Sequence, residues 1–157
     1  MTGKTIHVQI VTPYELFLED DVEMVVITCK DGEIGILPGH SPIIAALVPG
    51  EIRFRVGQNW RIAAATHGYA EIGPELAVIV VNAAEWPEQI DVRRAEQALK
   101  RAETKLHDPA GSFEDKNHAR HGAARAKARL KVVGKHQLSH SDRAANLPEN
   151  KTADQQI

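Results

Sequence analysis

The chain has 157 residues, of which 43% are hydrophobic, so it can bury a core and general disorder is not expected. A single cysteine excludes an internal disulfide framework, and no stretch approaches the ~18 apolar residues of a membrane-spanning helix. The net charge of −2 conceals a segregation: residues 1–90 carry five Lys and Arg against twelve Asp and Glu, whereas residues 91–135 carry twelve against six. Such asymmetry predicts that the two parts have different partners or contact each other.

Residues 1–85 carry the alternating pattern of β-strands. Ile6, Val8 and Ile10 alternate with polar residues, which is typical of a strand with one buried face. The pattern recurs in segments separated by Gly and Pro turns, at residues 23–29, 51–56, 60–66 and 75–81. Short strands at this spacing favour an antiparallel sandwich or barrel. Residues 76–81 (LAVIVV) are apolar on both faces and are predicted to form a central strand.

After Pro87 the pattern changes to the period of amphipathic helices. Asp91 is a candidate N-cap for a first helix, whose apolar stripe is Ala95, Ala98, Leu99, Ala102 and Leu106. A second helix carries the stripe Ala119, Ala123, Ala126, Leu130 and Val133. Two such helices joined by a short loop predict an antiparallel hairpin. Because its seam is mostly alanine, which buries little apolar surface, the hairpin is predicted to pack loosely enough to open.

These patterns divide the chain into three parts. We expect an antiparallel β-sandwich over residues 1–87 and a helical hairpin over residues 88–135. Residues 136–157 show no sustained period and are predicted to form a mobile tail.

Residues 31–42 (DGEIGILPGHSP) resemble a signature of the epsilon subunits of bacterial rotary ATP synthases. In that family the signature precedes a hydrophobic stretch and a Pro-Gly turn, here residues 47–50. The resemblance continues through residues 68–72 and 90–95, and covers about residues 5–133 in the right order and spacing. It implies a sandwich of about ten strands followed by a two-helix hairpin.

The resemblance also implies a function. Such subunits are non-catalytic rotor parts in the central stalk of the proton-translocating F-type ATP synthase, one copy per assembly, on the cytoplasmic face of the bacterial inner membrane. Their sandwich binds the gamma subunit and rests on the c ring, so they meet the membrane only through the complex. Their hairpin is a regulatory domain that folds against the sandwich or extends into the alpha and beta subunits of the catalytic head, where it inhibits ATP hydrolysis. The chain has no GxxxxGK[ST] loop and no Gly-x-Ser-x-Gly elbow, which agrees with a subunit that is not an enzyme and requires no cofactor.

A regulatory ATP site is a further implication. Some members bind ATP through an Ile/Leu-Asp-x-x-Arg-Ala motif, which residues 90–95 (IDVRRA) match in full. The candidate site residues are Glu85, Ile90, Asp91, Arg94, Ala95, Arg125 and Arg129. Arg125 and Arg129 would share one helix face and could pair with phosphates. Alternatively, Asp91 only caps its helix and Arg94 pairs with a surface carboxylate.

Residues near the signature are candidates for the subunit interface. Glu33 and His40 are predicted to face the c ring and the gamma subunit, although His40 could instead hydrogen-bond within its own turn. Ile43 and Ile44 complete the predicted interface, and with Leu47 they are expected to anchor the signature loop on the sandwich.

Other polar residues have simpler interpretations. The pairs His118/His121 and His136/His140 have spacings compatible with a metal, but no further ligands accompany them, so solvated helix faces are expected. Cys29 is predicted to be a small packed side chain.

Two alternatives stay open at this point. The basic hairpin could contact nucleic acid, although 4% aromatic residues give no stacking platform. The sandwich could instead bind a carbohydrate or another ligand. Salt-dependent DNA binding would support the first alternative, and co-purification with a gamma-type subunit would support the rotor hypothesis.

Overall fold

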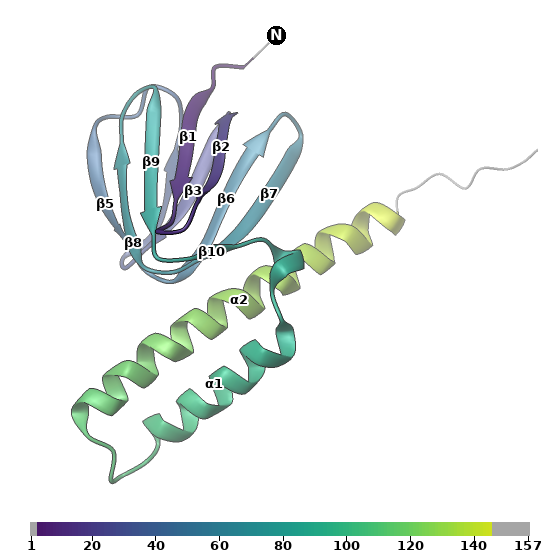
Figure 1. The fold of residues 1–157 in the computed structure, drawn as a ribbon. Helices are drawn as coiled ribbons and strands as arrows, with labels where there is room; N and C mark the ends of the chain where they lie inside the picture. The colour runs from purple at the N-terminus through teal and green to yellow at the C-terminus, as the bar shows by residue number, and fades with distance from the viewer. Residues whose placement is uncertain (1–2, 146–157) are drawn as a thin grey trace, which may run out of the picture.

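A computed structural model describes residues 3–145 and contains a β-sandwich followed by two helices (Figure 1). The strands are β1 (Ile6–Val11), β2 (Leu16–Val22), β3 (Met24–Cys29), β4 (Gly32–Ile36), β5 (Ile43–Leu47), β6 (Gly50–Val56), β7 (Asn59–Ala65), β8 (Gly68–Ile72), β9 (Leu76–Val81) and β10 (Ala84–Glu85). A short 3-10 turn, η1 (Pro87–Gln89), leads into α1 (Val92–Leu106) and α2 (Phe113–Ala145). The predicted fold class is confirmed.

The strands follow the order β10-β7-β6-β3-β5-β8-β9-β1-β2, with β4 paired to β3. β9 lies between β8 and β1, so the prediction of a central strand at residues 76–81 is confirmed. The expectation of antiparallel pairing throughout is wrong at one place, because β1 and β9 are parallel. Parallel strands cannot be joined by a tight turn, and most of the sandwich separates these two along the chain. Local turn residues therefore carried no sign of this pairing.

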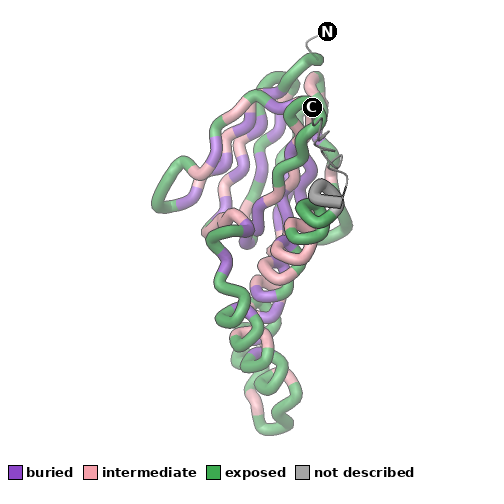
Figure 2. The backbone as a smooth tube through the Cα atoms, turned by 90° about the vertical axis from the view of Figure 1, so that its right-hand side faces the viewer, coloured by how far each residue is buried: buried purple, intermediate pink, exposed green. Residues whose placement is uncertain are grey.

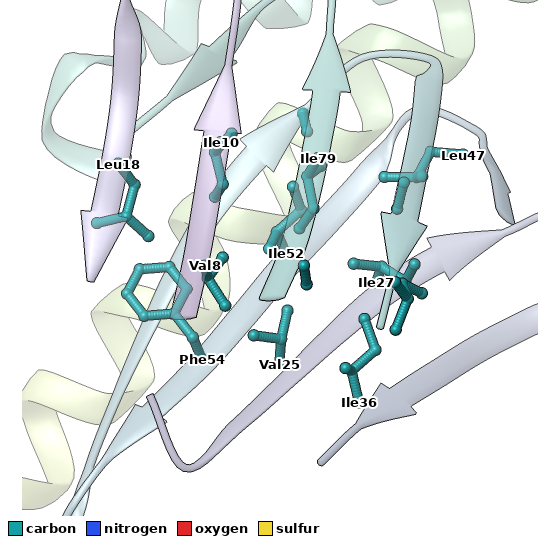
Figure 3. Close-up of a cluster of buried hydrophobic side chains, with 14 of the residues drawn as sticks. Val8, Ile10, Leu18, Val25, Ile27, Ile36, Leu47, Ile52, Phe54 and Ile79 are labelled. Atoms are coloured by element: carbon teal, nitrogen blue, oxygen red, sulfur yellow. The ribbon is translucent and has the colours of Figure 1, made fainter. Parts of the chain in front are cut away.

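Alternate residues of the strands fill the space between the two layers of the sandwich. Ile6, Val8 and Ile10 on β1 have no exposed surface. Figure 3 shows Val8, Ile10, Val25, Ile52, Phe54 and Ile79 converging from different strands on this core. Figure 2 shows buried residues along the strands, whereas the helices are mostly exposed. Most apolar burial in the molecule therefore belongs to the sandwich.

Gly68 begins β8 where the backbone of β9 approaches most closely. A Cβ atom at this position would lie 1.9 Å from the carbonyl oxygen of Val80. The glycine of the 68–72 segment is thus required by strand pairing, since any side chain would push the two strands apart.

Trp86 fixes the point at which the chain leaves the sandwich. Its indole ring stacks on Phe17 at 4.7 Å between ring centroids, and the Arg61 guanidinium lies 4.3 Å from its centroid. The direction in which the chain enters η1 and α1 is therefore set by aromatic packing.

α2 carries two buried stripes, only one of which the sequence predicted. Ala119, Ala123 and Ala126 are buried, and the first two pack with Ala102 of α1. Ala128 and Val132 are also buried, and Val132 packs with Ala64 of β7. The predicted seam residues Leu130 and Val133 are only half-buried. α2 is thus held between α1 on one side and the β6–β7 pair on the other.

The expectation of a mobile tail from residue 136 is wrong for residues 136–145, because α2 continues to Ala145. Gly134 does not end the helix, since it lacks the positive φ of a helix-stopping glycine. The side chains of Lys135 and His136 tie this part of α2 to the sandwich and to η1. Residues 146–157 lie outside the described part of the chain. No helix within residues 3–145 is long and apolar enough to cross a membrane.

His7 on β1 should make the stability of the sandwich depend on pH. Its ring bonds the carboxylates of Asp21 at 2.8 Å and Glu19 at 3.1 Å, and these bonds raise the pKa of His7 above 6.5. A raised pKa in the folded state adds stability that is present below the unfolded pKa and is lost as pH rises through the folded pKa. We therefore expect wild type to exceed His7→Gln in free energy of unfolding at about pH 5.5, and this difference to vanish by about pH 8.5. Urea unfolding of both chains at the two pH values checks this, and an equal difference at both would contradict it.

Candidate functional site

A cavity of about 400 Å³ lies where β10, η1, α1 and α2 meet. Of the predicted nucleotide-site residues, the structure brings together Glu85, Asp91, Arg94, Ala95 and Arg129 around this cavity. The remaining lining residues are Gln89, Ala98 and Arg101. Because the residues come from the sandwich and from both helices, this cavity is complete only when the hairpin lies against the sandwich.

Asp91 is the N-cap of α1, as the sequence predicted. Its Oδ1 accepts a hydrogen bond from the backbone N–H of Arg94 at 2.9 Å. This bond satisfies one of the free N–H groups at the start of the helix. The Ile-Asp-x-x-Arg motif thus has a structural reason as well as a proposed functional one.

Glu85 and Arg129 form an ion pair across the cavity wall. The Nε of Arg129 donates to Oε2 of Glu85 at 2.5 Å, and both side chains are half-buried. This pair connects β10 to α2, which lie far apart in the sequence. The pair fixes the guanidinium of Arg129 in the wall of the cavity. It also neutralises Glu85, which is one of the two carboxylates that line the cavity, the other being Asp91.

Two predicted site residues do not line the cavity. Ile90 is buried against Ala64 and Val132, so it serves the contact between the sandwich and α2. Arg125 lies with Glu85 and Arg129 around a separate, much smaller depression beside the ion pair. Arg101 does line the cavity, although it was not among the predicted site residues. Its position seven residues after Arg94, about two helical turns further along the same face, was the available signal.

The cavity has the charge that a phosphate chain requires. Within residues 3–145 neither Arg94 nor Arg101 forms an ion pair, so the surface-carboxylate alternative for Arg94 is not what the structure shows. Arg94, Arg101 and Arg129 therefore leave a positive excess after Glu85 is paired. Guanidinium groups bind phosphate oxygens bidentately, and a volume of about 400 Å³ is within the range of small-molecule sites. The residues present fit a nucleotide phosphate.

The signature residues have local contacts of their own. Glu33 accepts a bond from Arg53 at 2.7 Å. His40 Nδ1 lies 2.7 Å from the carbonyl oxygen of the next residue, Ser41, which is the local contact named as the alternative to an interface role. Whether Glu33 and His40 also meet another subunit stays a prediction.

Ile43 and Ile44 do not anchor the signature loop. They lie on β5 with 37% and 78% of their surface exposed, whereas Leu47 is 4% exposed and belongs to the core. Strand alternation places Ala45 and Leu47 inward and Ile44 outward. The anchoring prediction is therefore wrong for the two isoleucines and confirmed for Leu47. An outward-facing Ile44 is available for contact with another subunit.

The histidine pairs form no metal site within residues 3–145, where no group of three potential ligands was found. His136 is not on a solvated face as expected, because its Nε2 lies 3.1 Å from Glu88 and its ring packs against His140. These residues border a larger cavity of about 700 Å³ between β7, η1 and the end of α2, which contains none of the predicted site residues. Cys29 is half-buried against the core, as predicted, and burial raises the pKa of its thiol.

A β-sandwich followed by a helical hairpin, with a cationic cavity where the two meet, defines a two-part class of protein. Residues 5–87 match the profile of the family described as ATP synthase, Delta/Epsilon chain, beta-sandwich domain, and residues 88–134 match its long alpha-helix domain. The chain belongs to this ATP synthase Delta/Epsilon family. It is accordingly a non-catalytic subunit of the central stalk.

Named relatives cover most of the chain. It is 39% identical over 131 residues to the ATP synthase epsilon chain of Halalkalibacterium halodurans, a match that covers 83% of this chain and 98% of the relative. It is 42% identical over 133 residues to that of Syntrophobacter fumaroxidans, covering 85% and 98%. A chain in the Euglena gracilis mitochondrial ATP synthase structure has the same fold, with a TM-score of 0.74 at 20% identity, over 85% of this chain and 83% of that one. The family profile ends at residue 134, whereas α2 continues to Ala145.

Proposed function

We propose that this chain couples rotation of the proton-driven c ring to ATP synthesis and restrains ATP hydrolysis with its helical hairpin. The sandwich ties the gamma subunit to the c ring, as one copy in a complex attached to the cytoplasmic face of the inner membrane. The hairpin is a two-state element that either lies on the sandwich or extends toward the alpha and beta subunits of the catalytic head. Family membership favours this hypothesis over nucleic-acid or carbohydrate binding.

The observation that carries the proposal is the small apolar contact between the hairpin and the sandwich. α2 meets β7 through Ala64, Ile90 and Val132, with Ile62 and Val133 half-buried beside them. The two helices meet each other mainly through alanines, with Leu99 and Leu106 at the edge. At roughly 25 cal/mol per Å² of buried apolar surface, such contacts stabilise the docked state only modestly. A hairpin held this way can leave the sandwich without unfolding it.

The cavity gives a ligand a means to control the hairpin. Its walls include Glu85 of the sandwich, Arg94 of α1 and Arg129 of α2, which are together only in the docked state. A ligand shifts a two-state equilibrium by the difference between its affinities for the two states. ATP bound here would stabilise the docked hairpin and so relieve inhibition. At about 100 times the dissociation constant the shift reaches about 2.7 kcal/mol.

Titration of the isolated subunit with ATP tests this site. We expect Arg94→Ala and Arg129→Ala to weaken binding at least about tenfold, because each removes a charged donor to phosphate. Arg125→Ala should have a smaller effect, since Arg125 lies outside the cavity. Arg120→Ala, which removes an exposed arginine of α2 that does not line the cavity, serves as the matched control. Calorimetry measures all five chains.

No heat or chemical-shift change at millimolar ATP would remove the nucleotide from the proposal. Binding that is unchanged in both Arg94→Ala and Arg129→Ala would show that ATP binds elsewhere. The coupling role would be tested separately, by whether the chain co-purifies with a gamma-type subunit.

A further inference from the structure

Glu51 is a buried carboxylate on the outer face of the sandwich. It is 2% exposed, and no other charged residue is buried within residues 3–141, the part of the chain whose side-chain burial is described. On β6, Ile52 and Phe54 face the core of the sandwich. Because successive side chains of a strand point to opposite faces, Glu51 points away from the core. It is buried because α2 lies across β6 and β7 at this point. If α2 left the sandwich, the carboxylate of Glu51 would return to water.

Lys135 of α2 is the residue that neutralises Glu51. Its Nζ donates to Oε1 of Glu51 at 2.5 Å. Lys135 follows the buried Ala128 and Val132 at helical spacing, so all three are on the stripe that meets the sheet. It is also the first residue after the segment that matches the family profile.

Other cations near Glu51 compensate its charge less directly than Lys135 does, because none of them forms a hydrogen bond to it within the described residues. Nε of Arg53 lies 3.4 Å from the same Oε1 without forming a hydrogen bond, and Arg53 is also paired to Glu33. Burial by itself would raise the pKa of Glu51. The hydrogen bond from Lys135 and the charges of Lys135, Lys131 and Arg53 outweigh it and hold this pKa below its ordinary value. Oε2 of Glu51 is buried and has no hydrogen-bond partner among the described residues.

We infer that Glu51 and Lys135 form an electrostatic latch that holds the hairpin against the sandwich and selects which turn of α2 lies on β6. This inference rests on the proposed two-state hairpin and adds a second control, independent of nucleotide. Removal of one partner of a buried pair leaves an uncompensated charge, whereas removal of both charges does not. Loss of Lys135 therefore penalises the docked state selectively, because only there is Glu51 out of water.

The residue after the latch strengthens the same contact. His136 reaches Glu88 of η1 at 3.1 Å, so the part of α2 beyond the family profile is tied at two neighbouring positions. This extension lengthens the contact between α2 and the sandwich, and it makes the docked state more persistent than the 88–134 segment alone would.

The test compares five full-length chains, the labelled parent and four variants of it, by the distance between two spin labels. The labels are placed at Gln97→Cys on α1 and Glu71→Cys on β8, both exposed, after Cys29→Ser. The four variants carry Lys135→Met, Glu51→Gln, both substitutions, or Lys127→Met as the matched control, since Lys127 is exposed on the same helix. All are measured without nucleotide, so the outcome does not depend on the ATP site.

Lys135→Met is expected to raise the ratio of undocked to docked hairpin about tenfold. The full effect of a buried pair is larger, but Lys135 is 40% exposed and water screens part of it. In the Glu51→Gln background the same substitution should have little further effect. Lys127→Met should resemble wild type.

Equal populations in Lys135→Met and Lys127→Met would overturn the latch while leaving the two-state hairpin in place. A single short distance in every chain would instead contradict the two-state hairpin. The urea unfolding midpoints of the same chains then decide the latch. Non-additive losses for Lys135→Met and Glu51→Gln support it, and additive losses overturn it.

Discussion

Removal of residues 91–157 is expected to leave a sandwich that folds and unfolds cooperatively on its own. The core cluster of the sandwich draws on residues of β1 to β10 and Trp86, and none of its members lies in α1 or α2. Truncation exposes Glu51, Ala64 and Ile90, which adds one solvated carboxylate and a small apolar patch. We expect a modest loss in the free energy of unfolding, measured by urea unfolding. The near-ultraviolet circular dichroism of the folded chain, to which Trp86 contributes, should be unchanged. Failure of residues 1–90 to fold would contradict the division into sandwich and hairpin.

Within the assembled ATP synthase, the same truncation should leave coupling intact and give equal or higher ATP hydrolysis. The contacts assigned to gamma and the c ring lie on the sandwich, whereas the proposed brake is removed. Reconstitution with wild type or truncated chain, followed by hydrolysis and proton-pumping assays, measures both effects. Lower hydrolysis together with normal assembly would contradict the brake.

Leu47→Asp and Ile44→Asp, three residues apart on β5, are expected to differ strongly in their effect on the free energy of unfolding. Leu47 is buried in the core, so a carboxylate there loses apolar contacts and is desolvated without a partner. We expect a loss of at least ~3 kcal/mol, a large part of the stability of a small domain. Ile44 faces solvent, and its change to Asp should alter the urea midpoint little. Equal destabilisation by both substitutions would contradict the register of β5.

Ile44→Asp should instead weaken assembly if the exposed face of β5 meets another subunit. The expected result is a folded chain that no longer co-purifies with the gamma subunit, because an interface core excludes unpaired charge. Val56→Asp, at an exposed position near the end of β6, is the matched control and should co-purify normally. Normal co-purification and coupling of the Ile44 variant would remove Ile44 from the interface.

The sequence determined those features that depend on neighbouring residues. Alternation of apolar residues identified β1, β3, β6, β7 and β9, and the change of period after Pro87 identified the two helices. Asp91 was recognised as the cap of α1 because capping is a contact between residues three positions apart. The signature and the IDVRRA motif also indicated the family and most residues around the cavity.

Tertiary structure decided everything that depends on distant residues meeting. The parallel β1–β9 pair, the Glu85–Arg129 bond and the Glu51–Lys135 bond each join segments that no local pattern connects. The polar composition after Gly134 suggested a tail, but α2 continues there with Lys135 and His136 bonded to carboxylates of β6 and η1. From sequence alone a charged residue is predicted to be solvent-exposed, because its burial depends on a partner that only the folded chain brings near.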